Sequence, residues 1–173
     1  MAVTRTATPN KILLGMGVFK IGNVAVGLTR GGGQFTVERT YREIVADGDK
    51  GKYKDRIVID SSIPKLKMSA LEIIGENMKL LYPALSSEVN EGNTTITGTG
   101  EIVTGDYNNT VTWTGETKDG RQVVITLYNA INLDNLDFTL VEKDEVVAAV
   151  TYEGTYTEDS VADYEPWKIS WAN

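Results

Sequence analysis

The residues of this chain that could do chemistry are mainly carboxylates, because its 173 residues include no cysteine and no histidine. This composition excludes disulfides, zinc–thiolate sites and cysteine nucleophiles, and it removes the usual general base near neutral pH. Asp134 and Asp137 resemble the paired carboxylates of a glycosidase. However, 16 of the 24 acidic residues lie after residue 80, so such a pair is expected by chance. We expect no enzymatic activity and no cofactor.

A second acidic group, Asp47-Gly48-Asp49-Lys50-Gly51, begins like a calcium-binding loop. A helix–loop–helix calcium site starting at Asp47 would need an oxygen ligand at its fifth position and glycine at its sixth. Those positions hold Gly51 and Lys52, and the neighbouring lysines would oppose a dication. We therefore predict no metal site here and interpret the segment as a solvated or subunit-contacting loop.

The charge of the chain changes sign along its length. Residues 1–80 hold 13 basic and 8 acidic residues, a net of +5, whereas residues 81–173 hold 4 and 16, a net of −12. These halves are either two solvated surfaces or the complementary surfaces of two copies, since opposite fields steer association. The total of −7 argues against a DNA-binding footprint, which must be basic.

Alternating apolar residues predict strands over most of the chain. An extended arm (1–11) precedes a short hairpin with its turn at Gly22-Asn23, and two long strands (34–45 and 56–68) flank a long polar loop (46–55). Further strands follow residue 86, and an aromatic segment (165–173) is either an edge strand or a tail that docks on another subunit. The fold class we expect is a single mainly β domain, residues 1–173. It is an antiparallel β-sandwich or partly closed barrel with one flanking helix.

The flanking helix is predicted over residues 69–82. Ser69 and Glu72 have the spacing of a capping box, in which two side chains satisfy free backbone N–H groups. Leu71, Ile74, Met78 and Leu81 then follow at helical spacing, and Pro83 ends the pattern.

Two of the predicted strands carry polar side chains on a face where apolar ones are usual. Thr95, Thr97 and Thr99 lead to Glu101, and Thr110, Thr112 and Thr114 lead to Glu116. Such a face is either an exposed sheet surface or the wall of a water-filled space.

Several stretches of the chain resemble the major tail tube proteins of long-tailed bacteriophages. The likeness is closest in GLTRGGGQFTVER (27–39), YREIVADGDKG (41–51) and IPKLKMSALEI (63–73), and it extends through NLDNLD (132–137) to EPW (165–167). It covers about two-thirds of the chain.

This resemblance implies a sandwich that forms hexameric rings, which stack into a tube through which DNA leaves the capsid. The implied location is the virion tail, which is assembled in the bacterial host cytoplasm. No membrane partner is implied. The implied partners are other copies of the chain, the tape measure protein, the tail terminator and the tail-tip proteins. In this family the long hairpin loop and the terminal arms make contacts between rings. The residues expected at these contacts are Asp47, Asp49, Lys50, Lys52, Lys54, Arg5, Lys11, Trp167 and Trp171. Glu101 and Glu116 are expected to face the lumen.

Two other functions stay open at this stage. Trp113, Trp167 and Trp171 could stack on sugars, as in a monomeric carbohydrate-binding adhesin, although single aromatics on alternating strands usually belong to the core. A tail-end connector of the same fold is the second.

Overall fold

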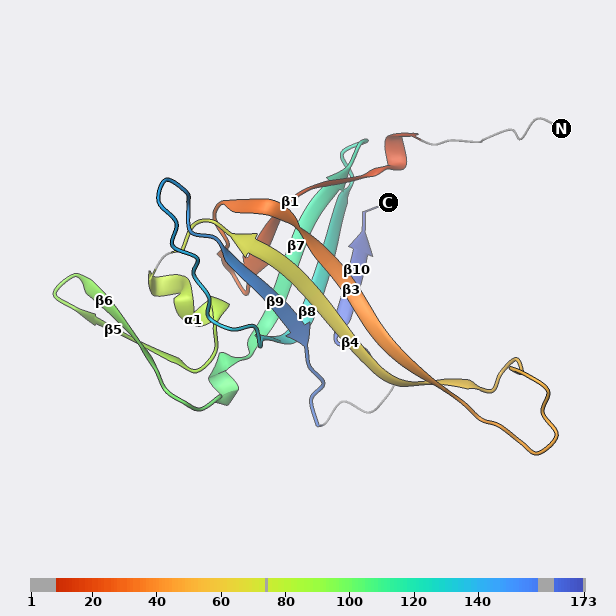
Figure 1. Ribbon diagram of the computed structural model, residues 1–173. Coiled ribbons are helices and arrows are strands. Elements are labelled where there is room, and N and C mark those ends of the chain that lie inside the picture. The colour runs from red at the N-terminus through yellow and green to blue at the C-terminus, as the bar shows by residue number, and fades with distance from the viewer. Residues whose placement is uncertain (1–8, 74, 159–163, 173) are drawn as a thin grey trace.

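The computed structural model describes residues 9–73, 75–158 and 164–172, and these form a mainly β structure with antiparallel pairing throughout (Figure 1). The strands are β1 (Leu13–Ile21), β2 (Val24–Ala25), β3 (Thr29–Glu43), β4 (Ile57–Ala70), β5 (Leu85–Asn90), β6 (Asn93–Gly98), β7 (Asn108–Thr117), β8 (Gln122–Asn132), β9 (Ala148–Gly154) and β10 (Trp167–Trp171). The helical turns are η1 (Pro9–Lys11), η2 (Gly75–Asn77), α1 (Met78–Leu81) and η3 (Thr104–Asp106). In this part of the chain no helix is long and apolar enough to cross a membrane.

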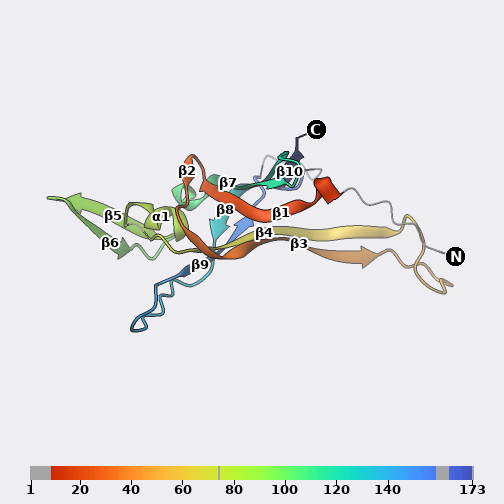
Figure 2. The same ribbon diagram turned by 90° about the horizontal axis from the view of Figure 1, so that it is seen from above.

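One large sheet in the order β2-β1-β7-β8-β9-β4-β3 makes up the body of the molecule. One edge of β8 has two partners: Val123–Leu127 pair with β10, and Ala130–Asn132 pair with β9. The sheet turns back on itself, so that β1 and β7 lie over β3 and β4 (Figure 2). Within the described ranges no ladder joins β1 to β3, and the arrangement is sandwich-like rather than a closed barrel. The predicted fold class is confirmed.

The core lies between these two layers and is filled from both. Tyr152, Met68, Leu127, Val111 and Val150 are fully buried in it. At two positions an aromatic side chain lies so close to the backbone that only glycine fits. A Cβ at Gly33 on β3 would lie 2.4 Å from Cζ of Phe19 on β1, and one at Gly115 would lie 2.2 Å from Cη2 of Trp113.

The helix predicted over residues 69–82 is wrong in its extent. Ser69 and Ala70 continue β4 and pair with Ala149 and Ala148 of β9. The carboxylate of Glu72 accepts a hydrogen bond from the backbone N–H of Leu28. Among the described residues of this segment, helical geometry is confined to η2 and the single turn of α1, which ends just before Tyr82-Pro83. Pairing with a distant strand therefore overrides the local capping pattern, as tertiary context commonly does.

Other elements agree with the sequence in place but differ in length. The turn at Gly22-Asn23 and the long β3–β4 hairpin form as predicted. The predicted strand that carries Thr95, Thr97 and Thr99 is expected to extend from Thr94 to Val103, but it stops at Gly98, and the chain bends at Gly100, whose φ is +77°. The sequence predicts a further apolar strand or an extended turn at Leu133, Leu136, Phe138 and Leu140, and these residues lie in a loop formed by residues 133–147. Of the predicted arm, residues 9–11 form η1, and the rest lies outside the described residues.

Candidate assembly surfaces

The β3–β4 hairpin extends well beyond the body of the molecule (Figures 1 and 2). β9 supports β4 only over Lys65–Ala70, so in the described chain residues 57–64 pair with 37–43 alone. At about 3.3 Å per residue, this hairpin ribbon (37–43 and 57–64) extends about 26 Å beyond the part of β4 that pairs with β9, and Ser62 and Pro64 at its base are buried. Two strands alone are marginally stable in water, so the ribbon is poorly suited to remain uncovered.

Large apolar side chains on the hairpin are exposed to solvent. Tyr41 is 62% exposed, Ile57 52% and Ile59 50%, and Val45 at the tip is 73% exposed. Contiguous apolar surface on a projecting element marks an interaction site more often than a free surface.

The loop predicted at 46–55 has an internal anchor. Asp49 accepts hydrogen bonds from the backbone N–H of Ala46 at 2.7 Å and from Nη1 of Arg56 at 2.8 Å. The Arg56 guanidinium also lies 4.9 Å from the ring centroid of Tyr53. Of the predicted contact residues here, Asp49 is thus occupied within its own loop. The others are exposed and form no ion pair with any described residue: Asp47, Lys50, Lys52 and Lys54.

The base of the hairpin is tied to the segment before β10. Nη2 of Arg39 on β3 lies 2.8 Å from Oε2 of Glu165, and the same carboxylate accepts a hydrogen bond from Nε1 of Trp167. The Trp167 ring packs against Phe35, with ring centroids 5.6 Å apart. These hydrogen bonds, that of Arg39 foremost, hold the pKa of Glu165 below its usual range although partial burial opposes the shift.

The two terminal segments hold the remaining predicted contacts. β10 is an edge strand on β8, so this alternative for residues 165–173 is confirmed. Trp167 is half-buried, whereas Trp171 is 52% exposed. Lys11 is exposed in η1. The neighbouring residue of η1, Asn10, accepts a hydrogen bond at its carbonyl from the backbone N–H of Asp119. Arg5 lies outside the described residues.

The outer face of β1, β7, β8 and β10 carries threonines, lysines and a serine, with two valines among them. One row across the four strands contains Lys20, Thr112, Thr126 and Lys168, and the next contains Val18, Thr114, Val124 and Ser170. Alternation along β7 puts Glu116 on this face with the three threonines, as predicted.

Glu101 does not belong to this face or to any strand. It lies in a bend beyond the end of β6, where its carbonyl accepts a hydrogen bond from Thr99 Oγ1 at 3.1 Å. The prediction that Glu101 continues the threonine face is therefore wrong.

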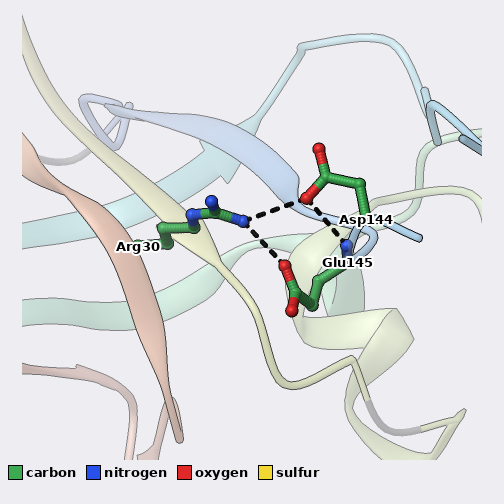
Figure 3. A network of polar contacts seen from close by, with 3 residues as sticks. All are labelled: Arg30, Asp144 and Glu145. Atoms are coloured by element: carbon green, nitrogen blue, oxygen red, sulfur yellow. Dashed lines mark hydrogen bonds and ion pairs between the residues drawn. The ribbon is translucent and has the colours of Figure 1, made fainter.

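The opposite end of the molecule from the hairpin tip is acidic. We call residues 84–106 and 133–147 the acidic end; they contain nine acidic residues and one basic residue. Arg30 on β3 anchors the 133–147 loop (Figure 3). Its Nη1 lies 3.3 Å from Oδ1 of Asp144 and 2.9 Å from Oε2 of Glu145. The pKa of Asp144 is lowered by the backbone N–H of Glu145 and then by Arg30.

Asp134 and Asp137 lie exposed in this loop rather than facing one another in a cleft. They lie close enough to Tyr82 to influence its phenol, whose pKa is raised first by burial and then by both negative charges. The Tyr82 hydroxyl is buried and finds no hydrogen-bond partner among the described residues. The described residues contain no cluster of three or more histidine, cysteine, aspartate or glutamate side chains that could hold a metal.

Trp113, whose ring lies against Gly115, is buried in the core. Of the three tryptophans, only Trp171 is well exposed.

Comparison with protein-family models and with curated proteins found no match to this chain.

Proposed function

We propose that this protein is a structural subunit that assembles with copies of itself into stacked rings, forming the tail tube of a long-tailed bacteriophage. The observation that carries the proposal is the hairpin ribbon, which is long, carries several exposed apolar side chains and pairs with no third strand of the described chain. The sequence resemblance supplies the ring, the tube and the tail partners.

The exposed apolar side chains of the hairpin, Tyr41, Ile57, Ile59 and Val45, support an assembled state. Association would cover both the ribbon and its free backbone edges.

The strand directions suit a ring of copies. β1, β7, β8 and β10 alternate in direction, so the two outer strands of this group, β1 and β10, run oppositely. β2 covers only Lys20 and Ile21 of β1. Rotation about a ring axis would then bring β10 of one copy antiparallel to β1 of the next. Six copies with four strands each, spaced about 4.8 Å and tilted roughly 45°, make a barrel about 50 Å across.

In such a barrel the polar face with Glu116 would line the lumen, through which DNA passes without specific binding. The partners proposed for the tube, on the resemblance, are the tape measure protein, the tail terminator and the tail-tip proteins. The tail is accordingly the proposed location.

Electron microscopy of the purified protein over a range of concentrations tests the proposal. Rings or tubes are expected, with size-exclusion chromatography showing a monomer that is lost as the concentration rises. Replacing residues 47–54 by a short Gly-Ser turn should preserve the circular dichroism spectrum but prevent stacking. A protein that stays monomeric at millimolar concentration, also with tail-tip proteins present, contradicts the proposal.

A further inference from the structure

Segments that extend from the body of the subunit lie at its opposite ends. The hairpin tip, residues 44–56, is at one end, and the β5–β6 hairpin and the 133–147 loop are at the other (Figures 1 and 2). An identical subunit placed along the same axis would therefore bring its tip to the acidic end of its neighbour.

The charges of the two ends are complementary. The tip contains four basic and three acidic residues, a net charge of +1. The pairing of Asp49 with Arg56 leaves Lys50, Lys52 and Lys54, together with Asp47 and Asp55, free of ion pairs with described residues. The acidic end carries a net charge of −8, from nine acidic residues and Lys143. Complementary potentials of this kind orient two partners and speed their encounter.

Within the acidic end, the 133–147 loop combines free carboxylates with exposed apolar side chains. Arg30 binds Asp144 and Glu145 (Figure 3), so the acids without an ion pair in the described chain are Asp134, Asp137 and Glu142. Four apolar side chains of this loop are more than half exposed: Leu133, Leu136, Leu140 and Val141. The tip offers the matching surface, with Ile44 and Val45 also more than half exposed.

We infer that the hairpin tip of one copy docks on the 133–147 loop of a second copy, with Lys50, Lys52 and Lys54 facing Asp134, Asp137 and Glu142. This inference rests on the proposed function and names the surface that receives the hairpin. The contact joins two different surfaces of the same chain, and with the copies displaced along one axis it repeats without closing and extends a stack in one direction. Arg30 is a positioning residue that holds the receiving loop in place.

Charge reversal tests this pairing. The tip variant K50E/K52E/K54E and the loop variant D134K/D137K/E142K are each expected to reduce the assembled fraction at least tenfold at low salt. The chain with both sets of changes restores opposite charges across the contact and is expected to recover assembly. The control K67E/K79E/K118E changes the net charge as much as the tip variant but alters lysines outside the tip, and it is expected to assemble like the wild type.

Circular dichroism and melting temperature establish that each variant is folded, and sedimentation with electron microscopy measures assembly. If the wild type assembles and both single-surface variants assemble equally well, the docking inference is wrong. It is also wrong if both fail and the combined variant fails too, because the two surfaces then do not face each other. If the wild type itself forms no rings or tubes, the proposed function fails instead.

Discussion

The carboxylate of Glu165 binds the guanidinium of Arg39, with 2.8 Å between Oε2 and Nη2. Arg39 belongs to β3, the last strand of the sheet path, and Glu165 lies two residues before β10, the branch strand on β8. The ion pair thus links β3 to the segment before β10, at the place where the hairpin leaves the body. About a third of each side chain or less is exposed, which reduces screening by solvent. We infer that the segment before β10 sets the direction in which the hairpin projects.

Replacing Glu165 with Gln is expected to lower the melting temperature at pH 7 by a few degrees at most. The folded-state pKa of Glu165 is depressed, so its stabilisation is present above the ordinary glutamate value of about 4.3 and is lost as the pH falls through the folded pKa. The difference between wild type and variant should therefore shrink in acid. Asp60→Asn breaks the more exposed pair with Arg42 and serves as the control. Equal melting curves for wild type and Glu165→Gln at pH 7 would contradict this role.

Gly115→Ala is expected to destabilise the fold by about 1–3 kcal/mol, because the added methyl group would overlap the Trp113 ring. Gly15→Ala is the control, since a Cβ there meets no atom within 4 Å. Urea unfolding followed by tryptophan fluorescence measures both. A similar loss in the two variants would mean that contact with Trp113 is not the cause.

Two buried tyrosines should respond oppositely to loss of their hydroxyl groups. Tyr82 has a buried hydroxyl without a partner in the described chain, so Tyr82→Phe is expected to stabilise the protein by about 1 kcal/mol. Tyr152 donates to the carbonyl of Leu80 at 2.7 Å, so Tyr152→Phe is expected to destabilise it by a similar amount. Thermal unfolding of both variants checks the signs. A Tyr82→Phe protein that melts below the wild type would show that this hydroxyl has a partner.

Glu116→Lys is expected to slow DNA ejection from assembled tails, most strongly at low salt, because it would place a ring of added positive charge on the proposed lumen. Glu101→Lys is the comparison, since Glu101 lies in a bend away from the threonine face. The subunit's melting temperature should barely change in either variant. If the Glu116→Lys variant ejects DNA at the wild-type rate at every ionic strength, this face does not line the lumen.

Strand positions were predictable wherever one face of the strand is buried. The alternation along β7 and β8 fixed which side chains face the core, and Glu116 was placed correctly for that reason. The error at Ser69 and Glu72 has a different origin. Their capping pattern is local, whereas the β9 residues that pair with the end of β4 lie about 80 positions further along the chain.

The contacts that shape the candidate surfaces were not predictable from local pattern. Arg30 is separated from Asp144 by 114 residues and Arg39 from Glu165 by 126, and no spacing rule connects such positions. The long polar loop between two strands was a sufficient signal for the hairpin. The loop did not indicate that the strands of this hairpin continue past the rest of the sheet, because that depends on where β9 ends.

The pairing of β1 with β7 has a consequence for how the subunit folds. Leu13 lies opposite Thr117, so most of the chain must be arranged before this ladder closes, whereas β3–β4, β5–β6 and β7–β8 each join neighbouring segments. Non-local ladders of this kind slow folding to roughly milliseconds or seconds. In that interval the edge of β7 is open to strands from other chains. Refolding yield should therefore decrease with protein concentration under conditions in which the native subunit remains monomeric.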